Sequence, residues 1–89
     1  MAFEIEQIRA DLYSEHIDMR RAIARITKIV DGKSEIPSAQ LADYQNQVDR
    51  WLIAHARAEA FAHALHHLTN ESEEAIYQAA YEYINRERN

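Results

Sequence analysis

The amino-acid sequence predicts an all-α fold, and three observations support this. Apolar residues recur at intervals of three and four through most of the 89 residues, which is the periodicity of helices that bury one face. The one glycine and the one proline, Gly32 and Pro37, lie in the same short segment, so strong helix breakers are confined to a single turn. Alanine occupies every even position from Ala54 to Ala64, which favours a helix that neighbours can approach closely. We expect one domain, residues 1–89.

The first predicted helix covers residues 3–31. Its apolar seam includes Ile5, Leu12 and Met19, which recur with heptad-like spacing. Gly32 follows at the position where a helix C-cap often adopts the left-handed conformation, so the helix is expected to end there. The chain then turns through the segment DGKSEIPS.

The second and third predicted helices cover residues 38–69 and 71–87. Ser38 can cap the second helix, whose apolar seam continues through Trp51. Asn70 followed by Glu73 resembles a capping box at the start of the third helix, and Arg86 suits its end. The two long helices predict an antiparallel hairpin, and the shorter third helix is expected to fold back along it.

The third helix is too short to cover the hairpin. A helix of about 30 residues spans ~45 Å, whereas one of about 17 residues spans only ~25 Å. Apolar residues beyond roughly the level of residue 54 would have one neighbouring helix instead of two, and such an uncovered strip is typical of an interface. We expect homodimerisation to complete the bundle; the alternative is that the long helices break or the third helix docks elsewhere. The predicted interface residues are Ile23, Ile26, Val30, Leu41, Tyr44, Val48, Trp51 and Leu52.

Polar residues interrupt both apolar seams at positions that the hairpin brings to a similar level. Glu15 and His16 interrupt the first seam, and His55 interrupts the second. Buried polar groups need hydrogen-bond partners, and a hydrogen bond between glutamate and histidine would supply them while fixing the register of the hairpin. We expect these three residues to form a polar layer in the core with a structural role.

Three of the five histidines lie near the end of the second predicted helix. His63 and His67, four residues apart, share a helix face and can bind one divalent ion through neutral imidazole nitrogens. A stable zinc site needs further ligands, and the nearby Glu59, Glu73 and Glu74 follow no recognised spacing. Because histidines in a last turn also interact favourably with the helix dipole, we expect no metal and no other cofactor. Protonating all five would change the formal net charge from −5 to −5 + 5 = 0, so a metal- or pH-responsive module is an alternative function.

Catalytic motifs are missing from the sequence, so we expect a non-enzymatic protein. It contains no Glu-x-x-His, no His-Glu-x-x-His and no glycine-rich phosphate loop. The first residues include acids and no apolar run, so we expect neither a signal peptide nor a membrane-spanning segment, and a cytoplasmic location. The net charge of −5 argues against nucleic acid as a partner. The alternative is a nucleic-acid-binding hairpin that uses Arg20, Arg21, Arg25 and Lys28.

Acids and tyrosines of the third predicted helix indicate a protein-binding surface. Glu73 and Glu74 lie in its first turn, and Tyr77 and Tyr81, four residues apart, share a flank. Tyrosine is enriched at recognition surfaces because its ring combines apolar area with a polar tip. The alternative is that both tyrosines are ordinary half-buried residues. We expect the four residues to bind another protein, and the module to act as a regulator, an inhibitor or an assembly factor.

Overall fold

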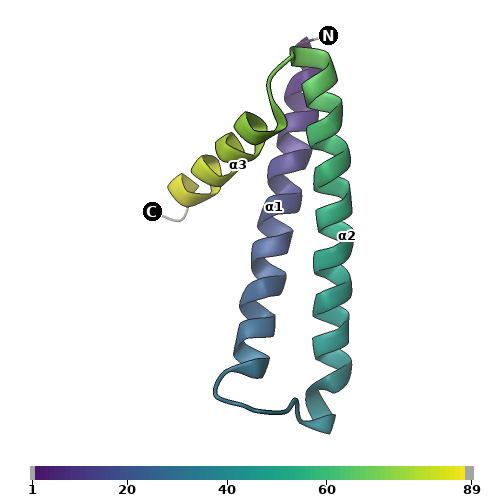
Figure 1. Cartoon of the computed structure of the whole chain (residues 1–89), viewed down its shortest axis with the longest axis vertical. Helices are drawn as coiled ribbons and strands as arrows, with labels where there is room; N and C mark the ends of the chain where they lie inside the picture. Colours follow the sequence, from purple (N-terminus) through teal and green to yellow (C-terminus); the bar gives the residue numbers. More distant parts are fainter. Residues whose placement is uncertain (1, 88–89) are drawn as a thin grey trace.

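The computed structural model describes residues 2–87, which form three α-helices (Figure 1). They are α1 (Ala2–Val30), α2 (Ser38–Thr69) and α3 (Glu73–Glu87), and the described residues contain no strand. The predicted all-α class is confirmed, and each predicted helix end lies within two residues of the end in the structure. Within residues 2–87, none of the helices has the length and apolar character that spanning a membrane requires.

Helices α1 and α2 form an antiparallel hairpin that accounts for the 49 Å length of the molecule (Figure 1). Gly32 has a φ of 66°, the left-handed conformation predicted after α1. The Lys33 N–H closes this turn by donating to the Val30 carbonyl oxygen at 3.1 Å. Pro37 occupies the N-cap position of α2, and no side chain caps that end. The predicted Ser38 cap is therefore wrong, because Ser38 is already the first residue of the helix.

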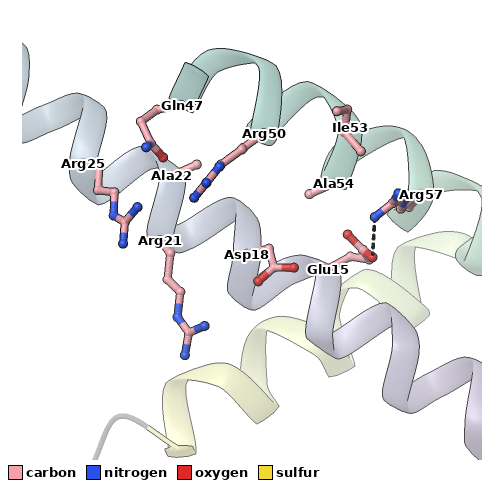
Figure 2. Close-up of a pocket in the computed structure, with 10 residues that line it drawn as sticks. All are labelled: Glu15, Asp18, Arg21, Ala22, Arg25, Gln47, Arg50, Ile53, Ala54 and Arg57. Atoms are coloured by element: carbon pink, nitrogen blue, oxygen red, sulfur yellow. Dashed lines mark ion pairs between the residues drawn. The ribbon is translucent and has the colours of Figure 1, made fainter. Parts of the chain in front are cut away.

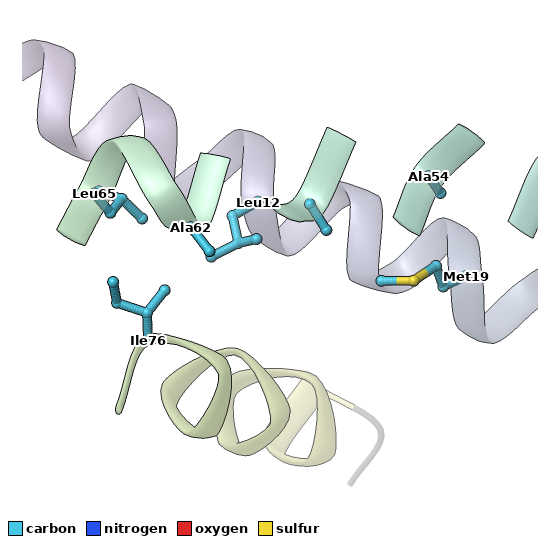
Figure 3. Close-up of a cluster of buried hydrophobic side chains, with 7 residues drawn as sticks. Leu12, Met19, Ala54, Ala62, Leu65 and Ile76 are labelled. Carbon is cyan, nitrogen blue, oxygen red and sulfur yellow. The ribbon is translucent and has the colours of Figure 1, made fainter. Parts of the chain in front are cut away.

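The core joins large side chains of α1 to small side chains of α2. The buried cluster consists of Leu12, Met19, Ala54, Ala58, Ala62, Leu65 and Ile76 (Figure 3). Because alanine has almost no side chain, the two helices can approach closely where alanines of α2 face Leu12 and Met19. Ala56 and Ala60 of the same alanine run are exposed, so only part of the run serves this close packing.

The connection between α2 and α3 is capped differently from the prediction. Asn70 has a φ of 63° and ends α2, with its N–H donating to the His66 carbonyl oxygen at 2.9 Å. Ser72 caps α3 instead, because its hydroxyl accepts the Ala75 N–H at 3.1 Å. The predicted capping box of Asn70 and Glu73 is therefore wrong: asparagine tolerates the left-handed conformation that the end of α2 requires, which leaves the capping of α3 to the serine.

Helix α3 turns back from the end of α2, starts beside α1 and runs obliquely to both long helices (Figure 1). Near the start of α3, the Arg9 guanidinium donates to both carboxylate oxygens of Glu71 and holds the pKa of that carboxyl below its usual value. Near the end of α3, Arg20 Nη1 donates to Asn85 Oδ1 at 3.1 Å. Helix α3 thus packs against the upper part of the hairpin only and leaves the end near the turn between α1 and α2 uncovered (Figure 1).

Candidate functional site

A cleft of about 440 Å³ lies between α1 and α2, and none of its lining residues comes from α3 (Figure 2). Ala22 and Ala54 are almost completely buried and form its floor, where their small side chains leave space between the helices. Ile53, which is 52% exposed, adds an apolar side chain to the cleft. We call it the arginine cleft, and its lining residues are Glu15, Asp18, Arg21, Ala22, Arg25, Gln47, Arg50, Ile53, Ala54 and Arg57.

The arginine cleft differs in charge between its two ends. At one end, Glu15 Oε1 lies 3.8 Å from Arg57 Nη1. Burial raises the pKa of Glu15, although this arginine opposes the effect. Toward the other end, Arg21, Arg25 and Arg50 form no ion pair or hydrogen bond within residues 2–87 (Figure 2). This half of the cleft therefore offers three guanidinium groups without a partner in the described part of the chain.

Sequence reasoning missed the arginine cleft because it grouped the basic residues by helix. The predicted basic stripe of α1 is divided: Arg20 reaches α3, whereas Arg21 and Arg25 line the cleft. Arg50 lies on α2, and only the register of the hairpin places it beside them. The available signal was the seven-residue spacing of Arg50 and Arg57, which puts both arginines on one side of a packed helix.

A second, more apolar groove of about 700 Å³ lies where α3 crosses the hairpin. We call it the crossing groove. All three helices contribute to it: Ile23 comes from α1, Trp51 and His55 from α2, and Tyr81 from α3. The Trp51 and His55 rings stack with their centroids 4.8 Å apart, which forms a flat aromatic wall.

None of the eight predicted interface residues is buried in the single chain. Ile23, Val30, Leu41 and Leu52 are exposed. The others, which are partly buried, are Ile26, Tyr44, Val48 and Trp51. Ile23 and Trp51 also line the crossing groove, so this apolar strip runs into the groove. That these residues form one interface, and that a second copy covers it, stays a prediction.

His16 is the buried member of the predicted polar layer. It is 6% exposed, and its Nε2 has no hydrogen-bond partner among the described residues. Its ring meets Tyr77 and Tyr81 edge-on, with centroids 5.7 and 5.6 Å apart. Burial lowers the pKa of His16, and the positive charges of Arg20 and His55 lower it further. The His16 ring thus lies on α1 against α3, in surroundings that disfavour its charged form.

The other two predicted members, Glu15 and His55, make their contacts elsewhere. Glu15 pairs with Arg57 in the arginine cleft, whereas His55 Nε2 lies 3.6 Å from Glu59 Oε1 and lines the crossing groove. The two side chains lie in different grooves of the hairpin, so the expected hydrogen bond between glutamate and histidine does not form between them. Glu15 therefore has an arginine as its neighbour, and His55 has a glutamate.

The two histidines considered as metal ligands lie side by side on the surface of α2. His63 Nε2 and His67 Nε2 are 3.1 Å apart, and His63 Nδ1 lies 3.7 Å from Glu73 Oε1. His66 is engaged separately, since its Nδ1–H donates to the Glu71 carbonyl oxygen at 2.6 Å. Among residues 2–87, no group of three or more histidine, cysteine, aspartate or glutamate side chains is arranged to hold a metal ion.

The four residues of α3 predicted to bind a partner differ in accessibility. Glu73 and Glu74 are exposed, and so is Tyr81. Tyr77 is half-buried against the core cluster, and this burial raises its pKa. The acids and Tyr81 therefore remain available to a partner, whereas Tyr77 also helps to seat α3 on the hairpin.

Comparisons with protein-family models, with curated proteins and with solved structures found no match to this chain.

Proposed function

We propose that this protein is a small, non-enzymatic, cytoplasmic interaction module that pairs with a second copy and acts by binding another protein, as a regulator, an inhibitor or an assembly factor. The observation that carries the proposal is the uncovered apolar strip along the hairpin. None of its eight residues is buried in the single chain, and four of them are exposed. Exposed apolar residues gathered along one part of a helical hairpin would be typical of an interaction site.

A second copy is the occupant that best fits the strip. A chain of 89 residues buries only a modest share of its surface, so one core provides marginal stability. The strip is formed by two long antiparallel helices, and a twofold axis would set the same two helices of a second copy against it. The product is a four-helix arrangement in which each strip covers the other.

The exposed part of α3 supports a role in binding another protein. Glu73 and Glu74 place two carboxylates in its first turn, and Tyr81, about two turns further along the same helix, is 51% exposed. An acidic helix that carries an accessible tyrosine is suited to a basic protein surface, because the carboxylates provide charge complementarity and the ring provides contact area.

The mass of the protein in solution tests its self-association. One leucine and the isoleucine that follows it provide matched variants. Leu52 is 53% exposed and Ile53 is 52% exposed, but Leu52 belongs to the strip whereas Ile53 lines the arginine cleft. We expect light scattering to give a dimer for the wild type and for Ile53→Glu, and a monomer for Leu52→Glu. A monomeric wild type, or the same mass change in both variants, would contradict the proposal.

A metal- or pH-responsive module is the second candidate function, and the geometry of His63 and His67 favours it. Two imidazole nitrogens bound to one zinc ion at about 2.0–2.1 Å can lie about 3 Å apart, and these Nε2 atoms are 3.1 Å apart. Glu73 beside His63 Nδ1 would favour the tautomer that leaves Nε2 free for a metal. A thermal melt of the wild type that is unchanged by zinc, by a chelator and by a shift to pH 5.5 would exclude this function. The variant His63→Gln is the control, in which zinc should have no effect.

A further inference from the structure

We propose that the arginine cleft binds an acidic, amphipathic segment of the partner protein. This rests on the proposed function, since it assumes that the partner is a protein. It adds the site and the chemistry of the segment that the site recognises. The inference depends on the unpartnered arginines, on the shape of the cleft and on the residues at its opposite end.

The first argument is the charge of the cleft in an acidic chain. The sequence has 15 acidic and 10 basic residues, so carboxylates are available for almost any surface arginine. Arg21, Arg25 and Arg50 nevertheless line one cleft and pair with no acid in residues 2–87. A ligand that carries carboxylates would supply the partners that these three guanidinium groups lack among the described residues. Guanidinium groups are well suited to that task because they bind carboxylates through two parallel hydrogen bonds.

The second argument is that the cleft offers apolar surface as well as charge. Its floor is formed by Ala22 and Ala54, and Ile53 is about half exposed beside the arginines (Figure 2). A free anion would use the guanidinium groups and leave the isoleucine in water. A peptide segment with acids on one side and an apolar residue beside them would use both, and a volume of about 440 Å³ can accept such side chains.

The third argument separates an acidic peptide from a nucleic acid. Glu15 and Asp18 line the other end of the cleft, where they would repel a backbone that carries a phosphate at every step. No aromatic side chain lines the cleft, so unpaired bases would find nothing on which to stack. A protein segment can place its acids against the arginines and a neutral or basic residue near the carboxylates.

Fluorescence anisotropy at low salt tests the proposal with a labelled helical peptide of about 20 glutamate and leucine residues, arranged as one acidic and one apolar face. The cleft variant is Arg21→Gln with Arg25→Gln and Arg50→Gln. The matched control, Lys28→Gln with Lys33→Gln and Arg86→Gln, removes the same charge from residues that do not line the cleft. We expect the cleft variant to bind the peptide about tenfold more weakly or worse, and the control to bind nearly as well as the wild type.

Three results would overturn the proposal. The first is that the wild type does not bind the peptide at low salt. The second is that both triple variants lose the same amount of affinity for the peptide. The third is that the wild type binds a single-stranded oligonucleotide more tightly than the peptide and that the cleft variant loses this binding. Both triple variants should fold normally, because all six substituted side chains are exposed, and circular dichroism checks this. Light scattering separates the two proposals: if the cleft variant is a dimer that binds the peptide as well as the wild type does, only the cleft proposal fails, whereas a monomeric wild type whose peptide binding is lost in the cleft variant contradicts only self-association.

Discussion

Replacing His16 with phenylalanine should stabilise the protein, although His16 is a buried polar residue at the junction of α1 and α3. Its Nε2 is buried without a hydrogen-bond partner in the described structure, and such an atom destabilises the folded state by about 1–3 kcal/mol. Phenylalanine keeps the edge-on contacts with Tyr77 and Tyr81. The larger ring fits less well, and misfit of this kind offsets roughly 1 kcal/mol of the gain. We expect His16→Phe to raise the free energy of unfolding at pH 7.5 by about 1 kcal/mol, or Tm by about 4–8 °C.

The same substitution should also reduce the acid sensitivity of folding. The pKa of His16 is lowered in the folded state by burial, with contributions from Arg20 and His55. Below pH about 6.5 the unfolded chain therefore binds more protons than the folded chain, so this part of the stability is full above that pH and is lost as the pH falls. The advantage of the variant over the wild type should therefore grow as the pH is lowered from 7.5 to 5.5.

Urea unfolding followed by circular dichroism at pH 7.5 and pH 5.5 measures both effects. The raised pKa of Glu15 acts in the opposite direction, since its protonation favours the folded state, but it is common to the variant and the wild type. His67→Phe, on the exposed surface of α2, shows whether removal of any histidine has the same consequence. The reasoning fails if His16→Phe is less stable at pH 7.5, or if its advantage over the wild type does not change between the two pH values.

Two further predictions concern the core and the end of α2. Leu12→Ala should lower the free energy of unfolding, measured in urea, by about 3–5 kcal/mol, because Leu12 is fully buried and its removal leaves a cavity between the helices. The control is Leu68→Ala at a partly exposed position, which should change this free energy by less than about 1 kcal/mol. Asn70→Gly should leave Tm unchanged or raise it slightly, while Asn70→Ala should lower the stability by about 1 kcal/mol, because alanine is strained at a φ of 63°; equal melting temperatures for the two variants would contradict this.

The sequence predicts the helices well because their signals are local and repeated. Apolar periodicity covers α1 and α2, and the only glycine and proline lie together in the turn between them. The caps were harder to predict, because neighbouring residues of the same chemical type compete for one role. Asn70 and Ser72 can both accept a hydrogen bond at the start of a helix, and the left-handed conformation at the end of α2 decides which of them does so.

The candidate surfaces were predicted only where helix length determines them. The short α3 implied an uncovered strip, and the structure leaves Leu41 and Leu52 about half exposed. The arginine cleft depends instead on which residues of α1 and α2 lie at the same level. A hairpin whose turn is centred near residues 34 and 35 would place residue 16 opposite residue 53, whereas Glu15 reaches Arg57 in the structure. A shift of a few residues changes which charges meet across a hairpin, and apolar periodicity does not determine register so closely.

The arrangement of the two surfaces around α2 determines how they can work together. Leu52 and Ile53 are neighbours in sequence, so their side chains point in directions about 100° apart around the helix. The strip and the arginine cleft therefore lie on different sides of α2, and a second copy seated on the strip would leave the cleft open. A dimer would then present two clefts, and a partner with two acidic segments would bind it with an apparent affinity above that of either cleft alone. Loss of self-association would in that case weaken binding of a bivalent partner while leaving binding of a single acidic peptide unchanged, so the two surfaces contribute in separable ways.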